Sequence, residues 1–117
     1  MKAKLDHPIE NFIFMLRNER VILANDLAAI YGVETRALNQ AVKRNQERFP
    51  IDFVYQLSED EKLSLRSQIV TLEKGKYLKY PPYAFSEHGA IMAAMILNSP
   101  QAISMSVYVI RAFIQVR

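Results

Sequence analysis

The sequence contains no cysteine, and this absence excludes several classes of protein. A chain without cysteine forms no disulfide framework and no cysteine-rich zinc site, and it has no thiol to use in catalysis. Its three glycines are too widely separated to build a glycine-rich phosphate-binding loop. Because no cluster of metal-ligating side chains is visible either, we expect no metal, no cofactor and no small-molecule substrate.

Long apolar runs are also lacking. The longest, near residues 90–97, is far shorter than the roughly 20 residues needed to cross a bilayer. At the amino terminus, charged residues and Pro8 interrupt the apolar run that a signal peptide requires. We therefore expect no membrane partner and a cytoplasmic location.

In other respects the composition is that of an ordinary globular protein. Half of the 117 residues are apolar and 23% are charged, which suits a single domain over residues 1–117. The formal net charge of +3 is compatible with an anionic partner, but many proteins without a nucleic-acid ligand carry as much. Charge alone therefore decides no function.

Strand-like segments lie in the first half of the chain. Residues 11–16 are apolar and aromatic, and residues 21–23 follow them after a polar group, which predicts a β-hairpin. Residues 53–57 suit a further strand. Ser58 and Glu61 then form a capping box, which predicts the start of a short helix.

Between the hairpin and the later strand, the spacing predicts two helices joined by a tight turn. Asn25 and Asp26 are suited to cap the first helix. Gly32 would end it in a left-handed conformation, and Thr35 would cap the second helix, which runs to about Arg48. Ala28 would lie where the two helices approach most closely. The expected buried positions are Leu27, Tyr31, Val33 and Leu38.

Two further helices are predicted at the carboxy terminus. Ser86 caps a helix over residues 87–97, and Ser99 with Pro100 begins the last helix. The last helix is apolar around most of its circumference, so we expect burial on more than one side. Its two apolar stripes are Ile103, Val107, Ile110 and Ile114, and Ala102, Met105, Val109, Phe113 and Val116.

These elements together predict an α+β fold. A helix-turn-helix would pack with a small antiparallel sheet and a carboxy-terminal helical pair. A second basic segment, with Lys74 and Lys76, separates the central helix from this pair. It is either a wing hairpin whose lysines follow a DNA backbone or a loop of ordinary solvated lysines, and the sequence leaves both open.

The second helix of the predicted helix-turn-helix carries side chains suited to DNA. Asn and Gln can bond bidentately to adenine, and Arg or Lys to guanine, through base edges in the major groove. Thr35 at the helix start, and Arg44 and Arg48 near its end, are candidates to hold phosphates. The alternative is an ordinary solvated helix face, and the acidic Glu34 opposes phosphate binding. The candidate base-reading residues, which share one strip of the helix, are Arg36, Asn39, Gln40 and Lys43.

No catalytic motif is recognisable. The two histidines, His7 and His88, stand without a nucleophile and acid in a known arrangement. Ser86 and Glu87 precede His88, but Ser86 is explained as a helix cap, and neighbours in the first turn of a helix point in different directions. We therefore expect no enzymatic activity.

Nearly the whole chain resembles the phage-derived KilA-N superfamily, in its branch named for an ORF-six amino-terminal domain. The most specific matches are RALNQAVKRN at 36–45, the Arg48-Phe49-Pro50 sequence, the strand at 52–57 and PPYAFSEHG at 81–89. The resemblance implies the amino-terminal DNA-binding module of a longer phage or prokaryotic regulator in the bacterial cytoplasm or nucleoid. Its residue-by-residue match supports as the contact set Arg36, Asn39, Gln40, Lys43 and Arg44.

The leading hypothesis is therefore a transcriptional regulator of phage or prophage type. It would bind double-stranded DNA sequence-specifically, with helix 35–48 in the major groove, and a homodimer through residues 99–117 is compatible with this role. The main alternative is an antirepressor-like interaction module that uses the apolar carboxy-terminal helix. RNA binding by the same basic surface is a third hypothesis.

Overall fold

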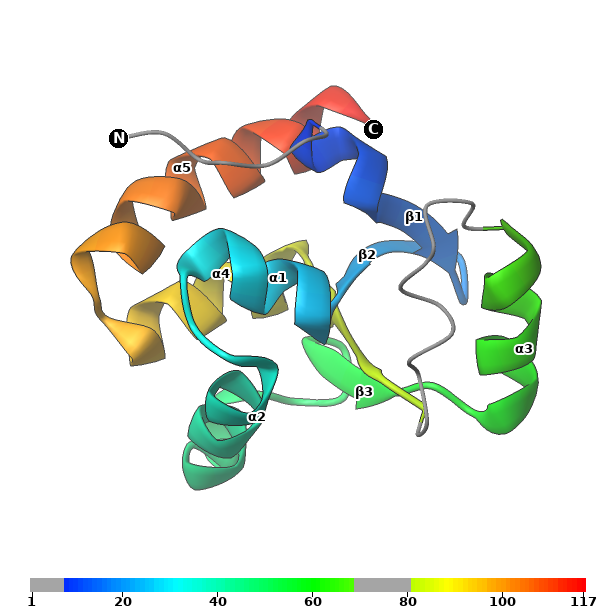
Figure 1. Ribbon diagram of the computed structural model, residues 1–117, viewed down its shortest axis with the longest axis horizontal. Helices are drawn as coiled ribbons and strands as arrows, with labels where there is room; N and C mark the ends of the chain where they lie inside the picture. The colour runs from blue at the N-terminus through cyan, green and yellow to red at the C-terminus, as the bar shows by residue number, and fades with distance from the viewer. Residues whose placement is uncertain (1–7, 69–80) are drawn as a thin grey trace.

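The computed structural model describes residues 8–68 and 81–117 (Figure 1). Within these residues, four strands form one antiparallel sheet in the order β1-β2-β4-β3. The same described ranges contain five α-helices and two short 3₁₀ turns, which surround the sheet. The predicted α+β class and the carboxy-terminal helical pair are confirmed.

The first two strands form the predicted hairpin. Strands β1 (Ile13–Leu16) and β2 (Glu19–Leu23) are joined by Arg17 and Asn18, whose φ angles are 53° and 64°. Two successive residues with positive φ are typical of the type I′ turn, whose twist matches that of paired strands. The strand begins later than predicted because the 3₁₀ turn η1 (Ile9–Phe12) precedes it, closed by a hydrogen bond from Asn11 N–H to the Pro8 carbonyl.

The other half of the sheet comes from distant parts of the chain. Strand β3 (Val54–Gln56) confirms the predicted strand in its central residues. Strand β4 (Tyr83–Ser86) lies between β2 and β3, with Ile22 opposite Phe85 on one side and Tyr55 opposite Ala84 on the other. The sheet is therefore complete only when β4, a late segment of the chain, inserts between β2 and β3.

The two faces of the sheet are buried against different helices. Ile22 and Phe85 are fully buried on the face covered by α1, α4 and α5. Val21 and Tyr55 belong to the opposite face, where Leu65 of α3 (Glu59–Gln68) is also buried. This division follows the alternation of side chains along a strand. Figure 1 accordingly shows α3 (green) on the opposite side of the molecule from α4 and α5.

The caps predicted for three helices are confirmed. At the start of α3, the Ser58 amide donates to Glu61 Oε1 at 2.8 Å and the Glu61 amide donates to Ser58 Oγ at 3.1 Å. Ser86 Oγ accepts from the Gly89 amide at 3.2 Å and caps α4 (Glu87–Leu97). Ser99 Oγ accepts from the Ala102 amide at 3.1 Å and caps α5 (Pro100–Gln115). The lysines of the proposed wing, Lys74 and Lys76, lie outside the described residues.

Helix α5 is buried on one side, not on several as the sequence predicted. The stripe that includes Ala102, Val109 and Phe113 is buried against the core. On the outer stripe, Ile103 and Ile114 are each 52% exposed. The described residues of a single chain therefore leave this second apolar stripe uncovered.

Candidate nucleic-acid interface

The first helix of the candidate site continues directly from the sheet. Helix α1 (Ala24–Tyr31) begins at the residue after β2, and its cap residue, Leu23, makes no side-chain capping hydrogen bond. Neither Asn25 nor Asp26 is the cap residue as predicted, because both lie inside the first turn. Asn25 Oδ1 is buried without a hydrogen-bond partner among the described residues, whereas Asp26 places a negative charge at the positive end of the helix.

The turn that follows α1 has the hydrogen bonding of a Schellman motif. Gly32 has φ 76°, its amide donates to the Ala29 carbonyl at 3.2 Å, and the Val33 amide donates to the Ala28 carbonyl at 3.0 Å. A side chain at Gly32 would also meet a neighbour, since a Cβ there would lie 2.6 Å from Gln101 Cδ. The role predicted for Gly32 is confirmed, and its cause is both conformational and steric.

The second helix begins one residue earlier than predicted and ends about four residues earlier. Helix α2 (Thr35–Arg44) has Glu34 as its cap residue, so Thr35 is the first helical residue and not the cap. The helix ends at Arg44 because Asn45 leaves the helical conformation and its Nδ2 donates to the Ala41 carbonyl at 2.8 Å. The 3₁₀ turn η2 (Gln46–Arg48) follows, so Arg48 does not lie on α2.

Apolar contacts fix α1 and α2 to the rest of the domain. Leu27 and Leu38 are fully buried and Ala28 nearly so, as predicted, whereas Val33 is only partly buried. The Tyr31 hydroxyl donates to the Ala90 carbonyl of α4 at 2.8 Å, and its burial raises the pKa of Tyr31. Over residues 8–68 and 81–117, nothing packs on the opposite side of α2.

The polar candidates on α2 separate into two groups. Asn39 and Thr35 are half-buried at the flank of the helix. The other candidates are exposed, and we call them the α2 outer face: Arg36, Gln40, Lys43 and Arg44.

The α2 outer face carries positive charge and little internal pairing. Its only ion pair among the described residues joins Arg36 Nη2 to Glu34 Oε1 at 4.0 Å, between side chains that are 84% and 81% exposed. A pair so exposed is worth little, and solvent or a phosphate can replace it. The cations of this face are therefore available to a ligand, as is the exposed Arg48 on η2.

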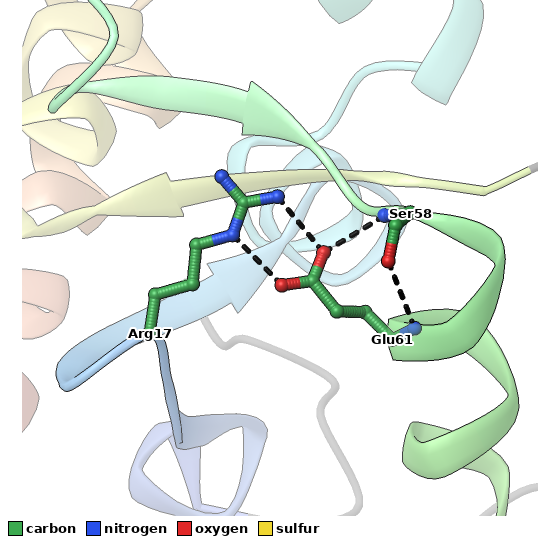
Figure 2. Close-up of polar contacts among 3 residues, drawn as sticks. All are labelled: Arg17, Ser58 and Glu61. Carbon is green, nitrogen blue, oxygen red and sulfur yellow. Dashed lines mark hydrogen bonds and ion pairs between the residues drawn. The ribbon is translucent and has the colours of Figure 1, made fainter.

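Sequence reasoning missed a second polar cluster, drawn in Figure 2. Arg17, in the hairpin turn, donates from Nε to Glu61 Oε2 at 2.7 Å and from Nη2 to Glu61 Oε1 at 2.9 Å. Its guanidinium also lies 4.0 Å from the centre of the Tyr55 ring. The hydrogen bonds from Arg17 and from the Ser58 amide lower the pKa of Glu61 to about 2. The capping box signalled Glu61, but nothing in the sequence signalled its bond to Arg17.

The residues Ser86, Glu87 and His88 have separate partners. Ser86 caps α4, Glu87 forms an ion pair with Arg117, and the His88 ring stacks on Phe53 with 5.6 Å between ring centres. They form no relay with one another. No three His, Asp or Glu side chains gather as metal ligands in the part of the chain that the structure describes.

The fold and the site together define a small α+β domain in which a paired α1 and α2 present a basic helix face. Residues 11–96 match the model of the ORF6N domain, and the chain belongs to this family. This confirms the branch predicted from the sequence, whereas its place in the KilA-N superfamily remains a prediction. Comparisons with curated proteins and with solved structures gave no match. Over residues 8–68 and 81–117, no helix has both the length and the apolar character to cross a membrane.

Proposed function

We propose that this domain binds double-stranded DNA by placing α2 in the major groove, as part of a transcriptional regulator of phage or prophage type. The proposal rests on the difference in burial between the two sides of α2. Leu38 is fully buried, while the α2 outer face is exposed and carries three cations. A helix held by one side with basic and amide side chains on the other has the form that major-groove recognition needs.

Each candidate residue has a role that its chemistry supports. Arg36 and Lys43 suit the acceptor edge of guanine, and Gln40 suits adenine. Asn39 sits at the flank of the helix, where its amide could reach a base edge only beside the main contact strip. Thr35 at the helix start and Arg44 at its end would hold phosphates and fix the register without reading sequence.

The competing interpretation is that the α2 outer face is only a solvated surface. Glu34 and Glu47 are exposed near it and would repel a phosphate backbone. Titration of labelled mixed-sequence duplex DNA at about 50 mM and about 200 mM salt separates the two interpretations, because phosphate contacts make affinity fall steeply with salt. Salt-insensitive or absent binding by the unmodified domain would contradict the proposal.

Selection from random duplexes then tests whether the binding is sequence-specific and identifies the site. Competition with structured RNA tests the third hypothesis. A preference for RNA over every selected duplex would replace the proposal with RNA binding.

A second proposal concerns assembly, and the exposed outer stripe of α5 favours it. Ile103, Val107, Ile110 and Ile114 follow one another at intervals of four, three and four residues, the spacing of a coiled-coil seam. In an antiparallel pair of α5 helices, Ile103 of one copy would oppose Ile114 of the other. Val107 would likewise oppose Ile110, so the stripe is complementary to itself. We therefore propose a homodimer within residues 99–117 in which the two copies meet through this stripe.

Sedimentation equilibrium of the domain and of Val107→Glu tests the homodimer. We expect the unmodified domain to self-associate and the variant to be monomeric, while the control Gln115→Glu behaves as the unmodified domain. A monomer at every concentration would contradict the homodimer. The exposed stripe would then be a binding site for another protein, as expected of an antirepressor-like module.

A further inference from the structure

The first turn of α5 lies against the turn that joins α1 to α2. Gln101, the second residue of α5, donates from Nε2 to the Ile30 carbonyl at 3.2 Å. The same amide group packs on Gly32, where an added Cβ would come within 2.6 Å of Gln101 Cδ and Oε1. One side chain therefore contacts the turn by both a hydrogen bond and close packing.

This contact adds a hydrogen bond at the end of α1. The last carbonyls of a helix lack partners within the helix. The Gly32 amide donates to the Ala29 carbonyl and the Val33 amide to the Ala28 carbonyl, while Gln101 Nε2 donates to the Ile30 carbonyl. The cap of α1 is thus shared between the turn itself and Gln101, which lies 71 residues after Ile30 in the chain.

The conformation of this turn sets the direction of α2. Only Val33 and Glu34 separate Gly32 from the first residue of α2, so the turn sets the direction in which α2 starts. The inner side of α2 is held by the buried Leu38 and the partly buried Val42, which pack on the apolar core, and its outer face has no packing partner among the described residues. Its orientation therefore depends on these contacts together with the residues that hold the turn.

We propose that Gln101 is a positioning residue for DNA binding, whose hydrogen bond to Ile30 fixes the turn and with it the orientation of α2. This inference rests on the proposed DNA-binding function. It also makes α5 part of the binding unit, although α5 lies beyond the residues that match the ORF6N domain. A protein bound to the outer stripe of α5 would therefore contact a helix that itself contacts the turn between α1 and α2.

The experiment compares two substitutions of Gln101 with a control on the same helix. Gln101→Met keeps the length of the side chain but removes the donor, and Gln101→Ala removes both donor and packing. Gln115→Ala is the control, because Gln115 is exposed on α5 and far along the helix from the turn. Amide hydrogen exchange of Gly32 and Val33 and affinity for duplex DNA are measured well below the unfolding temperature, where every variant is folded.

We expect both Gln101 variants to exchange the Gly32 and Val33 amides faster than the control and to bind DNA about fivefold more weakly, the effect of one net hydrogen bond. The salt dependence of binding should stay unchanged, since no phosphate contact is lost. This separates positioning from direct contact. The proposal would be overturned if Gln101→Met had the same DNA affinity as the control and the same exchange rates at the Gly32 and Val33 amides.

The two proposals fail in different ways. If the unmodified domain does not bind duplex DNA, the proposed function fails, yet hydrogen exchange still reports whether Gln101 holds the turn. If the domain binds DNA and both Gln101 variants bind as the control does, only the positioning role fails.

Discussion

Helices α2 and α3 each have ten residues, lie at the edge of the molecule and bury a leucine, Leu38 and Leu65, but arginine is used differently around them. The apolar residue Leu38 attaches α2, and the cations of its outer face have at most a weak pairing with Glu34. In the α3 region, Arg17 is bound by Glu61 in a bidentate pair. Arginine thus has a structural role in one region and is left available in the other, which is the difference expected between a fixed element and a ligand-binding one.

The largest change would come from removing the apolar attachment of α2. We expect Leu38→Ala to lower the free energy of unfolding by about 2–5 kcal/mol, because the side chain is fully buried and leaves a cavity. Denaturant unfolding measures the loss. The matched control, Leu63→Ala, changes a leucine on α3 that is 56% exposed, and it should cost far less. Equal losses would mean that α2 is not held by Leu38.

A smaller loss is expected at the turn. Gly32→Ala should lower the free energy of unfolding by about 1–3 kcal/mol, because alanine is strained at φ 76° and its Cβ displaces Gln101. Combining it with Gln101→Ala should cost less than the sum of the two single changes, since the displaced side chain is already gone. Additive losses in this double-mutant cycle would show that the two residues do not interact.

The ion pair of Glu61 with Arg17, which adds to the attachment of α3, should contribute less than Leu38 does, and its contribution should depend on pH. Glu61→Gln keeps the capping box but removes the charge, and we expect the thermal midpoint at neutral pH to fall by about 2–4 °C. The folded chain holds the pKa of Glu61 at about 2, below its ordinary value of 4.5. The stability that this carboxylate contributes is complete above about pH 4.5 and is lost as the pH falls toward 2.

Thermal unfolding across that pH range tests the assignment. Unmodified protein should lose stability between about pH 4.5 and about pH 2, and the gap between it and Glu61→Gln should close there. DNA affinity at neutral pH should be the same for both proteins, because Glu61 lies in the α3 region. A gap that stays constant with pH would mean that the charge of Glu61 is not what stabilises α3.

The smallest effect on stability is expected on the α2 outer face. Arg36→Ala should change the free energy of unfolding by less than about 0.5 kcal/mol, because the side chain is 84% exposed. On the proposed function, its affinity for selected DNA should fall about tenfold. Arg111→Ala removes the same charge from an exposed site on α5 and should bind as the unmodified domain does. Equal affinities for the two variants would remove Arg36 from the contact set.

The parts of the fold that the sequence predicted are those governed by neighbouring residues. Ser58 and Glu61 are three residues apart, and Ser86 and Ser99 each cap the helix that follows directly. Gly32 was predictable for the same reason, since its left-handed φ is a property of one residue. Exposure of the α2 outer face followed from helical spacing once Leu38 was recognised as buried.

What could not be predicted depends on distant or competing contacts. Arg17 and Glu61 are 44 positions apart, and Gln101 and Ile30 are 71 apart, so no local pattern joins them. Helix α2 ends before Arg48 because the Asn45 side chain donates to the Ala41 carbonyl. The spacing of apolar residues does not predict this hydrogen bond. Asn25 failed as a cap because β2 continues into α1 without the break that a cap residue needs.

The insertion of β4 between β2 and β3 has a consequence for how the chain matures during synthesis. The residues of the β1–β2 hairpin and of α1 and α2 are synthesised early. The second edge of β2 can pair only after residues 83–86 have left the ribosome. Until then, the strand that carries Val21, Ile22 and Leu23 presents unpaired backbone and apolar side chains, which is the template that strands of other chains use to aggregate. A nascent chain stalled before residue 83 would therefore contain the whole α2 outer face and still be prone to aggregate.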